Sequence, residues 1–379
     1  MNVALVLFAL QPPQVIVANL PELRSAAMNA KPGTTVLVKS GDYQGGLYLS
    51  DLHGQSGKPI TIAGQDPKNP PRFTGGGGVQ FSKVSHLELR DLRIQNITAN
   101  GLNIDDGGEL TKPSHHVTLK RIHVSDLPKG NHDGIKLSGL KDFRVEDCTV
   151  ERWGGSGIDM VGCHQGVIEG CVFRDGGDSG VQAKGGSSEI VVRTSRFKDF
   201  GQRGVNLGGS TGADYFRPPL AAMPKDGKFE ARNLRVEGCT FVGGVAPFAF
   251  VGVDGATARF STIIDPGKWV MRILQETRTE GFLPSRNGIF TDNLVIFSST
   301  GWSEGGVNVG PGTQPDSFQF ARNFWFCRDN PTRSTPRLPT SEKEGVYGKD
   351  PLIKVDAEGR VTVPASSPAA GFGSGAYRR

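Results

Sequence analysis

Short segments of alternating apolar and polar residues, each introduced by a turn glycine, recur along the middle of the chain. Apolar residues occupy every second position after the glycine, which is typical of a short strand that buries one face. The segments are NGLNI (100–104), DGIKL (133–137), SGIDM (156–160), SGVQA (179–183) and RGVNL (203–207). A second set of apolar-rich segments adds another strand to each repeat: HLEL, HVTL, FRV, GVI, EIVV and NLRV.

A small residue marks a third position of the repeat. Its members stand 23, 24, 44 and 22 residues apart, and they are Cys148, Cys171, Ser195, Cys239 and Ser261. The interval of 44 is one repeat of ordinary length that contains an insertion, and Asn293 and Asn323 continue the frame. Three strands in about 23 residues predict an all-β fold, a single-stranded right-handed parallel β-helix of about ten coils. Leucine-rich repeats have a similar period, but their L-x-x-L-x-L consensus and their helices are absent.

The two ends of the chain differ from the repeat. Residues 1–18 include the apolar run VALVLFAL, which we interpret as an export signal or as an N-terminal strand. Residues 19–58 are predicted to form an N-terminal cap with a short helix, because the first coil of a solenoid needs a cover. The β-helix is predicted over 59–326, and the irregular, Pro-rich segment 327–379 is expected to pack on the last coil. Three excursions leave the coils, at 105–114, 210–232 and 275–286.

Composition narrows the possible functions. The 53 glycines suit a chain that turns every few residues. A formal charge of +5 is compatible with an anionic partner, but it is too small to indicate nucleic acid binding. No segment has the length and apolarity of a membrane span. The five cysteines include no CxxC pair and no zinc spacing, so we predict free buried thiols.

The register of the coils predicts one polar face. Outward residues of successive coils stack about 4.8 Å apart, so polar residues of about four coils gather there. They are His132, Asp133, Lys136, Asp159, Asp178, Gln182, Lys184, Arg203 and Asn206. The excursion 210–232 starts from this face, and its Tyr215, Phe216 and Arg217 are predicted to make stacking and ionic contacts with sugars.

Three stretches resemble known polysaccharide lyases. GVQAKGGSSEIVVRTSRFKDF (180–200) resembles the β-helical pectate lyases that use a lysine base with calcium. The stretch 37–65 resembles their opening and that of the alginate lyase/chondroitinase B family, and 350–375 resembles a common ending of such proteins. The resemblance covers most of the chain as a pectin lyase-like fold, and it matches one catalytic position, Lys184. One coil later, GQRGVN (201–206) has no acid where those pectate lyases hold calcium.

The resemblance implies cleavage of an anionic, uronate-containing polysaccharide or oligosaccharide by β-elimination. Lys184 would be the base, Arg203 would hold the substrate carboxylate, and Lys136 would add positive charge. Calcium is the expected cofactor, held by carboxylates because hard cations prefer oxygen; the candidate ligands are Asp133, Asp159 and Asp178. The other face residues, His132, Gln182 and Asn206, would bind substrate. No organic cofactor is implied, and we expect a monomer that is secreted, periplasmic or at the cell surface.

The same residues are also compatible with purely structural roles. Outward lysines on a solenoid are often only solvated, and Asp before a turn glycine often bonds the local backbone. Asn103 and Asn206 also suit an asparagine ladder that satisfies turn backbone. If these roles are structural, the alternative function is that of a non-catalytic carbohydrate-binding or surface β-helix protein. A third alternative is a glycoside hydrolase, because GNHDGIKLSG (130–139) resembles the NTDG motif of polygalacturonases, although their later motifs are absent.

Overall fold

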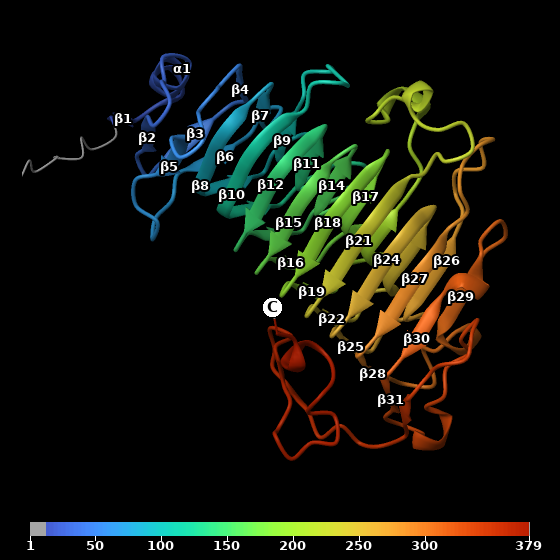
Figure 1. Ribbon diagram of the computed structural model, residues 1–379. Helices are drawn as coiled ribbons and strands as arrows, with labels where there is room; N and C mark the ends of the chain where they lie inside the picture. Colours follow the sequence, from blue (N-terminus) through green and yellow to red (C-terminus); the bar gives the residue numbers. More distant parts are fainter. Residues whose placement is uncertain (1–12, 379) are drawn as a thin grey trace, which may run out of the picture.

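Stacked parallel strands wind the chain into a long solenoid (Figure 1). The structure is a computed structural model, and it describes residues 13–378. Each coil contributes up to three short strands, and each strand pairs in parallel with its equivalent one coil earlier and one coil later. One face of the solenoid is a ten-stranded sheet, which agrees with the ten coils predicted from the repeat. The all-β parallel β-helix is therefore confirmed.

The ten-stranded face carries the alternating segments that follow the turn glycines. In coil order its strands are β4 (Leu47–Ser50), β7 (Val79–Ser82), β9 (Leu102–Asp105), β11 (Ile135–Ser138), β14 (Ile158–Val161), β17 (Ser179–Lys184), β20 (Arg203–Gly208), β23 (Ala246–Val251), β26 (Met271–Leu274) and β29 (Val307–Val309).

The other two faces are joined into one 22-stranded sheet, because β8 and β10 run without a break through both. The second face contains β1 (Gln14–Val17), β2 (Thr35–Val38), β5 (Ile60–Gly64), β8 (Ser85–Gln95), β10 (Ser114–Ser125), β12 (Leu140–Glu146), β15 (His164–Glu169), β18 (Ser187–Arg193), β21 (Ala231–Glu237), β24 (Val253–Arg259), β27 (Arg286–Thr291) and β30 (Gln319–Ala321). The third face contains β3 (Asp42–Gln44), β6 (Arg72–Thr74), β13 (Thr149–Glu151), β16 (Val172–Arg174), β19 (Arg196–Lys198), β22 (Thr240–Val242), β25 (Thr262–Ile264), β28 (Leu294–Phe297), β31 (Phe324–Cys327) and β32 (Val346–Tyr347).

Inward side chains of equivalent positions stack along the axis of the solenoid. Phe173, Phe197 and Phe241 form a column with ring centroids 4.7 and 4.6 Å apart and rings nearly parallel. Each ring is almost fully buried, which contributes about 1.5–3 kcal/mol. The small-residue frame lies beside this core, where Ser195 Oγ accepts from the backbone N–H of Cys171 at 3.1 Å.

Asparagines take over the small-residue frame in the last coils. Asn293 Oδ1 accepts from the N–H of Ser261 at 2.8 Å, and Asn323 Oδ1 accepts from the N–H of Asn293 at 3.0 Å. The asparagine ladder therefore forms at Asn293 and Asn323, inside the solenoid, where it satisfies backbone donors that water does not reach.

The N-terminal end is capped as predicted, but the coils begin earlier. Helix α1 (Leu20–Met28) starts at Asn19, whose side-chain oxygen accepts from the N–H of Glu22 at 2.9 Å. Strands β2, β3 and β4 already pair in register with β5, β6 and β7, so the stacking extends into the region assigned to the cap. Of the stretch 1–18, residues 1–12 lie outside the described residues. Residues 14–17 form β1, which pairs with β2.

The C-terminal segment lies along the third face and covers more than the last coil (Figure 1). Phe372 packs on Phe324 with centroids 5.4 Å apart, whereas Tyr377 Oη donates to Glu237 at 2.8 Å, several coils earlier. Lys198 on β19 donates to the carbonyl of Ala357 at 2.7 Å. The segment contains the antiparallel pair β33 (Lys354–Val355) and β34 (Val361–Thr362).

Besides α1, the helices are short 3-10 turns. They are η1 (Ala213–Tyr215), η2 (Leu220–Ala222), η3 (Glu304–Gly306), η4 (Pro315–Ser317), η5 (Pro331–Arg333) and η6 (Ser374–Ala376). None of the helices in the described part of the chain has the length and apolarity needed to cross a membrane.

All five cysteines are buried and free, as the sequence predicted. Burial raises the pKa of Cys163 to about 12 and that of Cys239 to about 12, so their thiolates are scarce at neutral pH. We expect a thiol reagent to leave the native protein unlabelled and to label five thiols after unfolding in denaturant. Rapid labelling of the native protein would contradict the buried placement.

Candidate functional site

The predicted polar face lies on the ten-stranded sheet, across β11, β14, β17 and β20. The strand register aligns Lys136 with Asp159, Asp159 with Gln182, and Gln182 with Asn206. Asn103 on β9 precedes them in the same row. The coil alignment read from the sequence is therefore confirmed. Two members of this row, Asp159 and Asn206, are almost fully buried. Lys136 and Lys184 lie beside Asp159, and Arg203 donates to Asn206.

Lys136 lies between two carboxylates. Its ammonium is 3.3 Å from Asp133 Oδ2 and makes a short contact with Asp159 Oδ2. Burial alone would lower the pKa of Lys136, but the charges of Asp159 and Asp133 outweigh it and raise the pKa. Burial and the charge of Asp159 raise the pKa of Asp133, and Lys136 and the N–H of Ser156 oppose the rise. Lys136 is thus a cation that neutralises these acids, in place of the free positive charge predicted for it.

Lys184 faces the other oxygen of Asp159. Its Nζ is 3.8 Å from Asp159 Oδ1, and its side chain is 21% exposed. Among the described residues no hydrogen-bond partner reaches Asp159 Oδ1, although this atom is buried. An unpaired buried carboxylate oxygen is costly, so it favours the approach of a donor. Lys136 and Arg203 were predicted to add positive charge to this face, but the charged group that lies next to Lys184 is the carboxylate of Asp159.

Arg203 is held by an acid from a distant part of the chain. Its Nη2 donates to Glu276 Oε1 at 2.6 Å, and its Nη1 donates to Asn206 Oδ1 at 3.1 Å. Glu276 belongs to the excursion 275–286, so the sequence did not connect it with this face. Arg272 on β26 continues the row, and its guanidinium lies 4.7 Å from the ring centroid of Trp269. Burial and the charge of Arg203 lower the pKa of Arg272.

Arg272 was missed as a face residue, although a signal was present in the sequence. The segment MRIL alternates as the earlier strands do, but no turn glycine stands directly before it. Gln182 and His132 make hydrogen bonds of their own. Gln182 accepts from Ser156 Oγ at 3.3 Å. His132 is half-buried in the turn before β11, and its carbonyl accepts from the N–H of Gly155 at 2.8 Å.

The three predicted calcium ligands do not fit a calcium site as they are placed. Asp133 and Asp159 are already bridged by the ammonium of Lys136. Asp178 is exposed in the turn before β17, and its carbonyl accepts from the N–H of Gln202 at 2.9 Å. A hard cation needs several free carboxylate oxygens around one point, and this arrangement does not offer them.

Two of the three loop residues predicted to contact sugars are buried. Phe216 is 1% exposed and packs against Phe282. Arg217 is 7% exposed and forms a bidentate ion pair with buried Asp106, at 2.5 Å from Nε and 2.9 Å from Nη2. Only Tyr215, at 63% exposed, is available for stacking. The prediction for Phe216 and Arg217 is therefore corrected: they anchor the loop 210–232 to the solenoid.

The anchoring depends on a glycine and on a second buried acid. A Cβ at Gly162 would lie 2.4 Å from Cβ of Arg217, so a side chain there would displace the arginine. Glu230 is fully buried and accepts from the N–H of Gly185 at 3.0 Å, the N–H of Thr211 at 3.0 Å and the hydroxyl of Thr211 at 2.7 Å. The loop is thus fixed at both of its ends.

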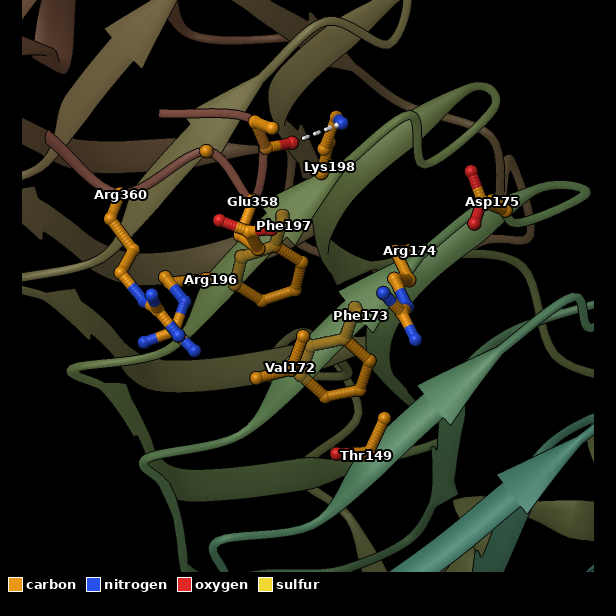
Figure 2. Close-up of a pocket in the computed structure, with 12 residues that line it drawn as sticks. Thr149, Val172, Phe173, Arg174, Asp175, Arg196, Phe197, Lys198, Glu358 and Arg360 are labelled. Carbon is orange, nitrogen blue, oxygen red and sulfur yellow. Dashed lines mark hydrogen bonds between the residues drawn. The ribbon is translucent and has the colours of Figure 1, made fainter. Parts of the chain in front are cut away.

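A cavity of about 320 Å³ lies on a different side of the solenoid (Figure 2). The C-terminal residues Ala357 to Arg360 form one wall, and strands β13, β16 and β19 form the other. Figure 2 shows Arg174, Arg196 and Lys198 along the strands, with Lys198 bonded to the tail. This cavity is separate from the polar face, because its lining comes from the third face of the solenoid.

Solved structures with the same architecture come from proteins of different chemistry. An alginate lyase from Paenibacillus sp. str. FPU-7 has a TM-score of 0.55 and 15% identity, with 80% of this chain and 97% of that chain covered. The A-module of the Azotobacter vinelandii mannuronan C-5 epimerase AlgE6 has a TM-score of 0.55 and 14% identity, with 86% of this chain and 93% of that chain covered. A lacto-N-biosidase from Eubacterium ramulus has a TM-score of 0.55 and 13% identity, with 89% of this chain and 68% of that chain covered. At such identities the likeness establishes the fold alone.

The sequence comparisons agree with this architecture. No curated protein matches the chain. A family model, the right handed beta helix region, matches residues 72–268, just over half of the 379 residues. These residues include β11, β14, β17 and β20, the strands of the polar face. The chain therefore belongs to the right-handed β-helix family.

Proposed function

We propose that this protein acts on carbohydrate, as a polysaccharide lyase that cleaves a uronate-containing polymer by β-elimination. The observation that carries the proposal is the placement of Lys184 on the polar face, beside a buried carboxylate oxygen of Asp159 that accepts no hydrogen bond from the described residues. Similar folds in an alginate lyase and a mannuronan epimerase support a substrate of the uronate class. Such polymers occur outside the cytoplasm, so we propose a secreted, periplasmic or cell-surface protein that acts as a monomer.

Three events make up the reaction. A base takes the proton from C5 of the uronate, the bond between C4 and O4 breaks as the C4–C5 double bond forms, and O4 receives a proton from an acid or from water. The C5 proton becomes acidic only when a cation stabilises the adjacent carboxylate. In this proposal Lys184 is the base and Arg203 binds the carboxylate.

The contacts of Arg203 leave it able to bind a second anion. A guanidinium has five N–H donors, and the bonds to Asn206 and Glu276 use one each on Nη1 and Nη2. The remaining donors can form a bidentate contact with a substrate carboxylate. Asp159 would orient Lys184, and His132, Gln182, Asn206 and Tyr215 would contact the sugar. The proposal gives calcium no step, because Lys136 already neutralises Asp133 and Asp159.

A second candidate is a carbohydrate-binding protein without catalysis. It is favoured by the internal pairing of the charges, since Lys136 is matched by two acids and Arg203 by Glu276. One assay separates the candidates: incubation with a panel of uronate polymers, such as pectate and alginate, with and without calcium. Rising ultraviolet absorbance from an unsaturated product supports the lyase. Saccharides without a double bond indicate a hydrolase, and binding without products indicates the second candidate.

A further inference from the structure

Four of the seven histidines of the chain gather at one place, away from the polar face. His86, His115 and His116 each offer a ring nitrogen, and these atoms all lie within 4.8 Å of one another. His53 lies beside them, in the bridge to β8, where its Nδ1 is 3.0 Å from Ser85 Oγ. Among the described residues this is the group in which three such ligand atoms converge.

The coil geometry explains why the rings meet. The register pairs His115 with Ser85, so His116 stands one coil after His86 at the same turn position. Both residues have a left-handed backbone, with φ of 54° and 48°. His, Asn and Asp tolerate this conformation better than most residues. Their rings stack with centroids 4.4 Å apart, and the ring of His115 lies edge-on to both.

The same turn position recurs in later coils without histidine. Its occupants, all with a left-handed backbone, are Asp142, Gln165, Glu189, Asn233, Gly255 and Asn287. The backbone therefore does not demand histidine there. The conformation of the turn therefore does not explain why His115 and His116 are both histidines next to His86.

The distances suit shared coordination. Nδ1 of His115 and Nδ1 of His116 are 2.8 Å apart. Two nitrogens that bind one metal at about 2.0–2.1 Å are about 2.9 Å apart at a right angle and about 3.4 Å apart at the tetrahedral angle that Zn²⁺ prefers, so a small opening of the two rings would admit the ion. His86 and His115 are half-buried and His116 is exposed. Neutral imidazole is the form that binds metal.

We propose that His86, His115 and His116 bind one divalent transition-metal ion of the zinc type. Imidazole suits Zn²⁺, Ni²⁺ and Cu²⁺, whereas Ca²⁺ prefers oxygen. Asp142 is next along the same turn position, and its charge acts on His115, so it adds a negative charge near the ion. The ion joins the coils of β8 and β10. This site is independent of the proposed lyase chemistry, because it lies on another face.

The test is titration of the full chain, made without a polyhistidine tag, with Co²⁺ and then Zn²⁺. We expect one ion per chain, a visible Co²⁺ spectrum that Zn²⁺ abolishes by displacement, and a higher unfolding temperature with Zn²⁺. The variants are His86→Asn and His116→Asn, because asparagine keeps the left-handed backbone. Each is expected to weaken binding by at least about tenfold, since even outer-shell changes cost about 10- to 100-fold.

The matched control is His132→Asn, which removes a histidine from a turn outside the cluster. It should bind Co²⁺ as the unchanged chain does. Circular dichroism and the unfolding temperature without metal confirm that each variant is folded, and a variant that fails this check is replaced by His115→Gln. The proposal is overturned if the unchanged chain gives no Co²⁺ spectrum, or if folded cluster variants and His132→Asn bind equally well.

Discussion

Replacing Lys184 with alanine is expected to lower the rate of β-elimination by about 10²–10⁴-fold, the usual contribution of a general base. The Nζ atom is 3.8 Å from Asp159 Oδ1 and the side chain is only partly buried, so the fold should tolerate its removal. The measurement is the initial rate of unsaturated product from the polymer that the panel identifies. KM should change less than kcat, because the base acts mainly in the transition state.

Two further variants make this result specific. Lys184→Arg keeps the charge but cannot lose its proton at neutral pH, so it should be as inactive as the alanine variant. Lys68→Ala removes an exposed lysine from an early turn and should leave the rate unchanged. Full activity of Lys184→Ala would remove Lys184 from the mechanism. Activity of Lys184→Arg near that of the unchanged protein would show that only its charge matters.

Removing Arg217 is expected to give the largest loss of stability. Its side chain is 9% exposed and that of Asp106 is 1% exposed, so Arg217→Ala leaves a buried carboxylate without its partner. Breaking such a pair costs about 3–5 kcal/mol. The free energy of unfolding from urea titration measures the loss. Limited proteolysis should cut the loop 210–232 sooner, because its anchor is gone.

The double variant Asp106→Asn with Arg217→Met controls for the unpaired charge. It removes both charges and keeps most of the volume, so it should be clearly more stable than Arg217→Ala. If Arg217→Ala instead costs less than about 1 kcal/mol, the pair behaves as an exposed ion pair, and its role as the anchor is wrong.

The repeat alone determined the fold and the register of the polar face. Turn glycines, alternating strands and the small-residue frame recur at nearly constant spacing, and each coil can bury its apolar side only on the next. Equivalent residues are therefore forced to stack, so Lys136, Asp159, Gln182 and Asn206 could be aligned from their spacing. Three of the five buried cysteines, Cys148, Cys171 and Cys239, follow from the same frame.

The partners of those residues were decided by the tertiary structure. Glu276 reaches Arg203, and Asp106 reaches Arg217, from excursions whose paths no repeat specifies. Loop paths depend on burial and pairing across coils, so the sequence placed Phe216 and Arg217 at the surface when they are buried. The histidine cluster is partly of the same kind. The aligned segments HLEL and HVTL already place His86 and His116 one coil apart, but only the tertiary structure shows that their rings stack and that the ring of His115 lies edge-on to both.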